Sequence, residues 1–198
     1  VMKIALVRGP YLRPNGIYPW ERLNELTNHE VVAFKSRPAR FEAEDLNLPV
    51  RSLEWIDGRH QLFGYENFFK RALSKAGLPS DYLRGMSELT NEFDIIHTSE
   101  NFNAFSLQAA ITTRNSNTKF VFSTGENIPY PLRQRSPIMW KAKTYVNQQA
   151  SAITTTTQLG KRALIHEGVD HNKITVIPNC VKPEQFRPSN KPDPEDVG

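Results

Sequence analysis

The sequence predicts an α/β fold, a Rossmann-like parallel sheet flanked by helices on both faces. Strand-length apolar segments alternate with helical segments along most of the 198 residues, and such alternation gives a parallel sheet with right-handed crossovers. The segment KIALV begins at residue 3, and a loop rich in Gly and Pro follows it, where open α/β sheets bind ligands. The length suffices for one domain with a well-filled core.

Each element follows from a local pattern. Short apolar runs predict strands at 3–7, 31–34, 50–53, 94–97, 119–122, 152–155 and 174–177. Apolar residues at helical spacing, or a capping residue, predict helices at 20–27, 63–76, 80–92, 105–112, 136–149 and 157–167. The clearest helix start is Ser136-Pro137, with Ser as cap and Pro at the first position.

Composition narrows the class of protein. With 38% hydrophobic and 23% charged residues, the chain is typical of soluble globular proteins. Its apolar runs are too short for a bilayer crossing, its first residues resemble no signal peptide, and we expect a cytoplasmic protein. The single cysteine, Cys180, excludes an internal disulfide and a cysteine-based zinc site. The net charge of +4 is modest, and without a nucleic-acid-binding signature we expect no nucleic-acid partner.

The segment Lys173–Pro188 organises the C-terminal part of the chain. Its apolar run predicts a strand buried on both faces, which Pro178 ends because proline cannot donate to a ladder. The run Val176-Ile177-Pro178-Asn179, followed by Phe186-Arg187-Pro188, resembles the hinge of glycosyltransferase family 4 (group 1). The DIIH strand at 94–97 and the segment SAITTTTQLGKRALIHEG at 151–168 are similar to the same family.

The resemblance implies one half of a two-domain GT-B enzyme. Residues 1–188 are expected to form the N-terminal, acceptor-side domain, and residues 189–198 to begin the linker to an absent C-terminal donor domain. The implied reaction is retaining transfer from a nucleotide-diphosphate sugar, held mainly by the absent domain, to a sugar or lipid-linked acceptor. The isolated domain is expected to be inactive because the crevice needs both walls. The alternative is a non-catalytic, Rossmann-like binding or interaction domain.

Neither a metal nor another cofactor is expected, since the five histidines are scattered. The helix predicted at 63–76 has a basic face. That face is interpreted either as a solvated surface or as a peripheral contact with an anionic membrane at the inner face.

In a doubly wound sheet, loops leaving the carboxyl ends of strands converge on the ligand crevice. Asn15 and Gly16 follow the first strand and resemble the family's glycine-rich loop, although a plain type I′ or II turn explains them equally well. The DIIH strand resembles the family's D-V-V-H-x-H pattern, with Ser99 in place of the second histidine. Glu100 is expected to orient sugar hydroxyls beside Asn101, and His97 is either a core residue or a ligand contact.

A third polar group follows the strand at 119–122. The resemblance places a histidine that contacts the transferred sugar where Gly125 stands, so Gly125 and Glu126 are the candidate catalytic positions. Either Glu126 supplies the polar contact from the next position, or the substrate differs from the usual one, or Glu126 is a loop acid without a role. Thr124 and Asn127 are further candidate binding residues, and Thr156–Gln158 form the fourth polar cluster.

Asn179 is the candidate hinge residue. A separate basic segment follows the third polar group. The segment either meets an anionic acceptor, with Arg135 as the candidate contact, or is solvated surface. It consists of Arg133, Arg135, Lys141 and Lys143.

Overall fold

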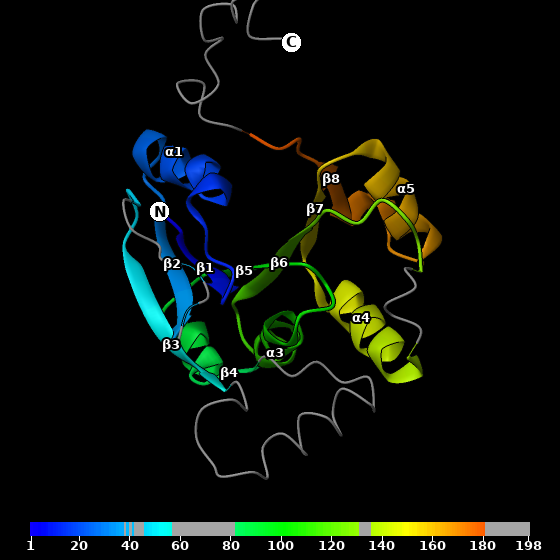
Figure 1. The fold of residues 1–198 in the computed structure, drawn as a ribbon, viewed down its shortest axis with the longest axis horizontal. Helices are drawn as coiled ribbons and strands as arrows, with labels where there is room; N and C mark the ends of the chain where they lie inside the picture. Colours follow the sequence, from blue (N-terminus) through cyan, green and yellow to red (C-terminus); the bar gives the residue numbers. More distant parts are fainter. Residues whose placement is uncertain (38, 40, 42–45, 57–81, 131–135, 181–198) are drawn as a thin grey trace, which may run out of the picture.

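The computed structural model describes residues 1–37, 39, 41, 46–56, 82–130 and 136–180. They form an eight-stranded sheet in the order β4-β3-β2-β1-β5-β6-β7-β8 (Figure 1). Every neighbouring pair is parallel except β3 and β4, so the predicted Rossmann-like parallel sheet is confirmed. The strands are β1 (Lys3–Gly9), β2 (Glu30–Arg37), β3 (Val50–Ile56), β4 (Tyr82–Leu83), β5 (Ile95–Ser99), β6 (Lys119–Thr124), β7 (Ala152–Thr155) and β8 (Ile174–Val176).

The helices follow the strands in the predicted alternation. They are α1 (Tyr18–Leu26), α3 (Ala104–Thr113), α4 (Pro137–Gln149) and α5 (Gln158–His166), with short 3-10 helices η1 (Pro14–Gly16), η2 (Met86–Asn91) and η4 (His171–Lys173). The caps predicted at Ser136 and Thr157 are confirmed. Ser136 accepts a hydrogen bond from the Met139 amide at 3.5 Å, and Thr157 accepts one from the Gly160 amide at 3.0 Å.

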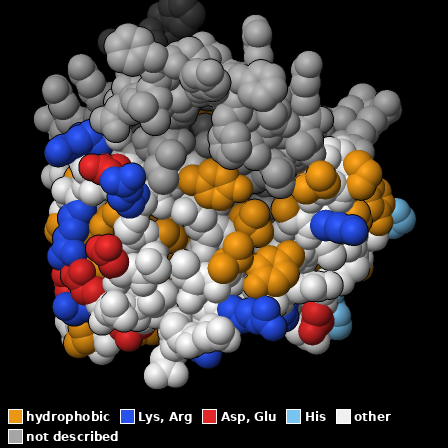
Figure 2. All heavy atoms as spheres, turned by 90° about the horizontal axis from the view of Figure 1, so that it is seen from below, with side chains coloured by type: hydrophobic (Ala, Val, Ile, Leu, Met, Phe, Trp, Pro, Cys, Tyr) orange, Lys and Arg blue, Asp and Glu red, His pale blue; other side chains and the backbone are white. Residues whose placement is uncertain are grey.

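The period-two pattern of the strands divides the core between the two faces of the sheet. On β1, Ala5 and Val7 belong to the large core under η2, α3 and α4, whereas Ile4 and Leu6 belong to a smaller core that packs against α1. Leu164 on α5 joins the large core. Figure 2 shows the side of the molecule that carries α3 and α4, where hydrophobic side chains gather.

The α1 face is covered unevenly. Under α1, the β1 and β2 side chains are buried. Farther along the same face, Ser123 on β6 and Thr154 on β7 are only partly buried, and Thr175 on β8 is exposed. Since α1 is the only described helix on this face, no described helix covers the half above β6, β7 and β8, which we name the open half of the α1 face.

Two predicted elements differ from the structure. The strand β8 was predicted to be buried on both faces. In the described part of the chain it pairs only with β7 and is therefore an edge strand, and its Thr175 side chain is exposed. The helix predicted at 80–92 is wrong at Tyr82–Leu83, which is strand β4, and its later part is the 3-10 helix η2. Gly85, with a φ of 87°, separates them because a left-handed residue cannot continue a helix.

Two other expectations concern membranes and the basic helix. The helix predicted at 63–76 lies outside the described residues, as does the linker predicted at 189–198. Within the described part of the chain, no helix has both the length and the apolar character that a membrane crossing requires.

Candidate functional site

A row of polar side chains crosses four adjacent strands near their carboxyl ends, on the α1 face. Arg8 from β1 approaches His97 from β5, with Nη1 3.2 Å from Nδ1. The His97 Nε2 atom lies 2.9 Å from Ser123 Oγ on β6, and that oxygen lies 2.6 Å from Thr154 Oγ1 on β7. The strand register produces this row, because Leu6 pairs with His97 and Ser123 pairs with Thr154.

The chemistry of the partners fixes the direction of these hydrogen bonds. An arginine only donates, so His97 Nδ1 accepts from Arg8 and the ring proton lies on Nε2. His97 therefore donates to Ser123. Burial lowers the pKa of His97 well below its usual value, and the neighbouring Arg8 cation lowers it further, so the ring is neutral at physiological pH.

Arg8 is a partly buried cation whose direct hydrogen-bond partners among the described residues are neutral. Its Nη1 group donates to the Val7 carbonyl at 3.2 Å and to His97, and its guanidinium lies 5.9 Å from the Trp20 ring centroid. Burial lowers the pKa of Arg8 to about 10, against an opposing effect of the Glu100 charge, so the side chain stays protonated at neutral pH. No carboxylate of the described residues lies within ion-pair distance of it. The Trp20 ring also packs edge-on against His97, at 4.5 Å between centroids.

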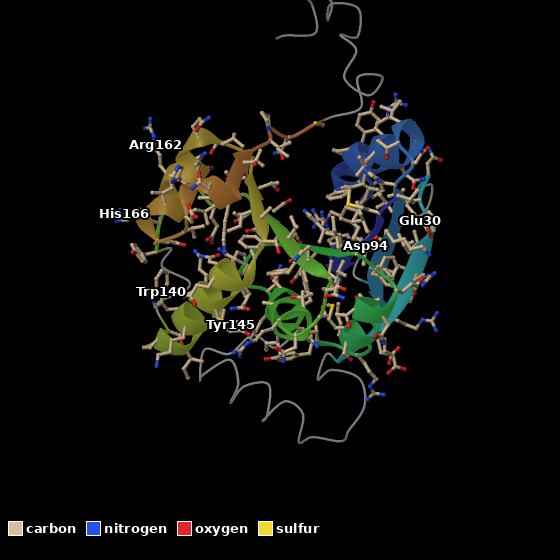
Figure 3. The ribbon with its side chains drawn as sticks, turned by 180° about the vertical axis from the view of Figure 1, so that it is seen from behind. Glu30, Asp94, Trp140, Tyr145, Arg162 and His166 are labelled. Carbon is tan, nitrogen blue, oxygen red and sulfur yellow. The ribbon has the colours of Figure 1, made fainter. Side chains whose placement is uncertain are left out.

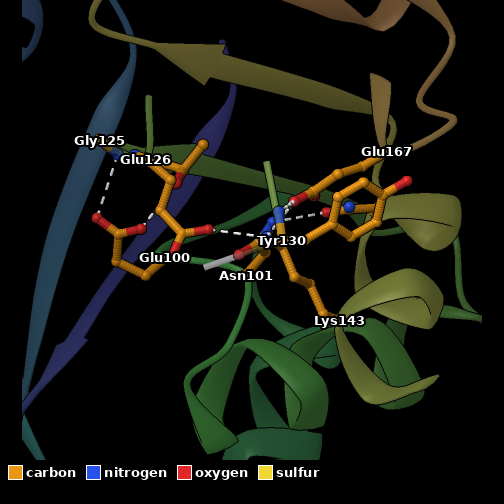
Figure 4. A network of polar contacts seen from close by, with 9 residues as sticks. Glu100, Asn101, Gly125, Glu126, Tyr130, Lys143 and Glu167 are labelled. Atoms are coloured by element: carbon orange, nitrogen blue, oxygen red, sulfur yellow. Dashed lines mark hydrogen bonds and ion pairs between the residues drawn. The ribbon is translucent and has the colours of Figure 1, made fainter. Parts of the chain in front are cut away.

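Glu100 joins the loops after β5 and β6. Its backbone is left-handed, with a φ of 61°, a strained conformation that the Ser106 hydroxyl supports by donating to the Glu100 carbonyl at 2.6 Å. The carboxylate accepts from Thr124 Oγ1 at 2.7 Å and from the Gly125 amide at 3.2 Å (Figure 4). The two loops that the sequence assigned to the crevice are therefore in direct contact.

Glu126 belongs to a buried charged cluster instead. Its carboxylate lies 2.8 Å from Lys143 Nζ on α4, and the same ammonium lies 2.8 Å from Glu167 at the end of α5 (Figure 4). The Lys143 side chain is 1% exposed, so the interpretation of this lysine as part of a solvated or acceptor-facing basic segment is wrong. The Tyr130 amide also donates to Glu167, at 3.0 Å, which draws the loop after β6 against α5.

Three aromatic rings pack together on the flank beside this charged cluster. The Tyr130 ring lies 4.8 Å from the Trp140 ring on α4 and 5.7 Å from the His166 ring on α5, measured between centroids. Figure 3 shows Trp140 and His166 on the same flank of the molecule, away from Glu30 and Asp94.

The start of α5 packs tightly on the loop after β6. Asn127 shares a short hydrogen bond with Thr157, the cap of α5. A Cβ added to Gly160 would lie 2.1 Å from Thr155 Oγ1 and 3.0 Å from the Glu126 carbonyl oxygen. A glycine is required here because the helix approaches the strand end too closely for a side chain.

The remaining candidate residues are dispersed. Gly16 is exposed at the end of the 3-10 turn that includes Asn15, and it lacks the positive φ that a type I′ or II turn requires of glycine. Asn101 is buried, and its amide donates to Asn147 at 2.9 Å. Asn179 is exposed beyond β8, and Arg135 lies outside the described residues.

The sequence did not predict the roles of Arg8, Trp20 or Lys143 in these networks. For Arg8, the available signal was its position directly after the apolar core of β1. Among the described residues, no group of three or more His, Cys, Asp or Glu side chains is arranged to hold a metal ion.

The comparisons with known proteins agree with this fold. The family model of the glycosyl transferase 4-like domain matches residues 20–180. The chain belongs to this family. The resemblance drawn from the DIIH strand and the VIPN hinge is thereby confirmed. A search of curated proteins found no match.

Several solved structures are similar to this family member in fold, and the match covers less than half of each of them. Anabaena HepE in complex with UDP has a TM-score of 0.63 at 13% identity, and the match covers 99% of this chain and 48% of HepE. HepE in complex with UDP-glucose gives 0.62 at 14%, with the same coverage. The UDP-GlcNAc 2-epimerase of Methanocaldococcus jannaschii gives 0.57 at 18%, covering 90% of this chain and 46% of the epimerase. The chain thus spans about half the length of these proteins.

Proposed function

We propose that this glycosyl transferase 4-like chain is the acceptor-side, N-terminal half of a retaining glycosyltransferase that uses a nucleotide-diphosphate sugar. Residues 1–188 would form this half, and residues 189–198 would begin the linker to a donor domain. The observation that carries the proposal is the contact of Glu100 with Thr124 and Gly125, which joins two loops at the carboxyl edge of the sheet. Family membership and similarity to HepE, which is solved with UDP and UDP-glucose, support a nucleotide sugar as donor.

Glu100 is the carboxylate that we assign to the acceptor. It is partly exposed, and its strained backbone is typical of functional positions. Because Thr124 and the Gly125 amide hold the carboxylate, its orientation is fixed before a sugar binds, which lowers the cost of ordering. Glu126 is a weaker candidate for direct catalysis, since its carboxylate is paired with Lys143.

The proposal is tested with the protein that contains this chain together with its predicted donor domain. Transfer and hydrolysis of UDP-glucose, UDP-GlcNAc and related donors are measured for the wild type and for Glu100→Gln, Glu126→Gln and Glu30→Gln. Glu30 is the matched control because it is exposed at the amino end of β2, at the opposite edge of the sheet. We expect Glu100→Gln to lower kcat/KM at least tenfold and Glu30→Gln to leave it unchanged.

Three outcomes would contradict parts of this assignment. Wild-type kinetics in Glu100→Gln would remove the acceptor role of Glu100. Interconversion of UDP-sugars without transfer would replace the transferase by an epimerase. Absence of any turnover across the donors, in a folded protein, would favour the non-catalytic binding domain.

A further inference from the structure

Arg8 has the unused hydrogen-bonding capacity of a binding residue. A guanidinium carries five N–H donors, and the Nη1 group of Arg8 uses its two on the Val7 carbonyl and His97 Nδ1. The donors on Nε and Nη2 have no acceptor within the described part of the chain. Nε and Nη2 form the edge that binds two oxygens of a carboxylate or phosphate in one plane.

The described residues around Arg8 hold the guanidinium in place, and none of them places a carboxylate within ion-pair distance. Trp20 and His97, whose rings contact each other, both lie against Arg8, and His97 is itself held by Ser123. Because Arg8 is only partly buried, its unused donors are accessible to an incoming anion, and hydrogen bonds from a guanidinium to an oxyanion are stronger than those between neutral groups. Glu100 influences Arg8 through its charge but is held by Thr124 and Gly125, so it does not occupy this edge.

The position of Arg8 agrees with a ligand contact. The residue is partly exposed one position before the end of β1, at the carboxyl edge of the sheet. It begins the polar row that continues along the open half of the α1 face to Thr154. Ligands of open α/β sheets bind outside this edge.

We propose that the Nε–Nη2 edge of Arg8 binds an oxyanionic group of the acceptor, through the two coplanar oxygens that a phosphate and a carboxylate share. This inference rests on the proposed function, which assigns the donor diphosphate to the other domain and therefore leaves the acceptor as the source of the oxyanion. It names a class of acceptor, an acidic or phosphorylated sugar.

The experiment is an NMR titration of the 198-residue chain with inorganic phosphate, D-glucuronate and neutral D-glucose at constant ionic strength, following the His97 ring nitrogens. We expect saturable shifts with phosphate or glucuronate and none with glucose, and the stronger of the two anions identifies the source of the oxyanion. Arg8→Gln should weaken anion binding at least tenfold. Arg8→Lys, which keeps the charge but not the planar edge, should give an intermediate loss.

Arg114→Gln is the matched control. It removes the same charge from an exposed arginine at the end of α3, and it should bind like the wild type. Wild-type affinity in both Arg8 variants, or no binding of either anion by the wild type, would overturn the proposal. If Arg8→Gln fails to fold by circular dichroism, Arg8→Lys decides.

The test separates this inference from the proposed function. Displacement of phosphate by UDP at the Arg8 edge would assign that edge to the donor and overturn the acceptor assignment. Undiminished transfer to a neutral acceptor by Arg8→Gln would overturn the proposal that Arg8 binds an oxyanionic acceptor and would leave the proposed transferase function in place. Anion binding that depends on Arg8, in a protein without any sugar transfer, would retain the site and remove the proposed function.

Discussion

Two cations lie near the carboxyl edge of the sheet, the fully buried Lys143 and the partly buried Arg8, and the described residues compensate their charges differently. Lys143 is enclosed between two carboxylates, Glu126 and Glu167, which tie the loop after β6 to α4 and α5. Arg8 is bonded to a carbonyl oxygen and a neutral imidazole. The comparison teaches that burial of a cation does not by itself mark a binding site. What distinguishes the two is whether the protein already supplies the counter-charge.

Two glycines in these parts of the chain differ in how tightly they are packed. Beside Lys143, α5 approaches the strand end so closely that only glycine fits at Gly160. In the loop that follows Arg8, a Cβ added to Gly16 would have no neighbouring atom within 4 Å. The strand end at Gly160 is therefore closed, and Gly16 faces open space. The following predictions break or sharpen this contrast.

The largest expected effect is the loss of Lys143. Lys143→Met should lower the free energy of unfolding by about 3–5 kcal/mol, because it leaves buried carboxylates without their cation. Lys141→Met is the matched control, an exposed lysine on the same helix, and should stay within about 0.5 kcal/mol of the wild type. Urea denaturation measures both. Equal stability of the two variants would show that the charged cluster contributes little.

A second comparison concerns glycine. Gly160→Ala should destabilise the fold by about 1–3 kcal/mol, since its Cβ would overlap Thr155 Oγ1 and press on the Glu126 carbonyl oxygen. Gly16→Ala should change stability by no more than about 0.5 kcal/mol. Thermal melts of both variants, followed by circular dichroism, provide the measurement. A larger loss in Gly16→Ala than in Gly160→Ala would reverse the assignment of closed and open regions.

The smallest expected effect is the pH dependence that His97 confers. Burial and Arg8 lower the pKa of His97 well below its usual value, whereas in the unfolded chain it titrates near 6.5. Below that pH the unfolded state binds a proton that the folded state does not, so the free energy of unfolding decreases as the pH is lowered. Above it, this residue contributes no pH dependence. Between pH 7.5 and 5.5 the loss from His97 should be about 1.4 kcal/mol.

His97→Gln provides the control for that measurement. The other four histidines remain in both proteins, so the difference between the two pH profiles isolates His97. We expect the variant to lose about 1.4 kcal/mol less than the wild type over the same interval, measured by urea denaturation at each pH. Identical profiles would mean that the His97 pKa is not lowered in the folded protein.

The sequence by itself determined the order of strands and helices, the caps at Ser136 and Thr157, and the family. These features depend on residues close together in the chain, such as alternating apolar positions in a strand or a serine before a proline. The same local rules failed at 80–92, where Gly85 takes a left-handed backbone, and at β8, whose edge position depends on the pairing of the whole sheet.

Only the tertiary structure distinguished Lys143 from Lys141, or joined Arg8 to His97, which lies 89 positions away. The physical reason is that a charged residue has the same local pattern whether it is solvated or enclosed. Its partners come from other strands and helices, and strand register and helix packing select them. For this protein, that selection placed two carboxylates around Lys143, whereas none of the described residues places a carboxylate within ion-pair distance of Arg8.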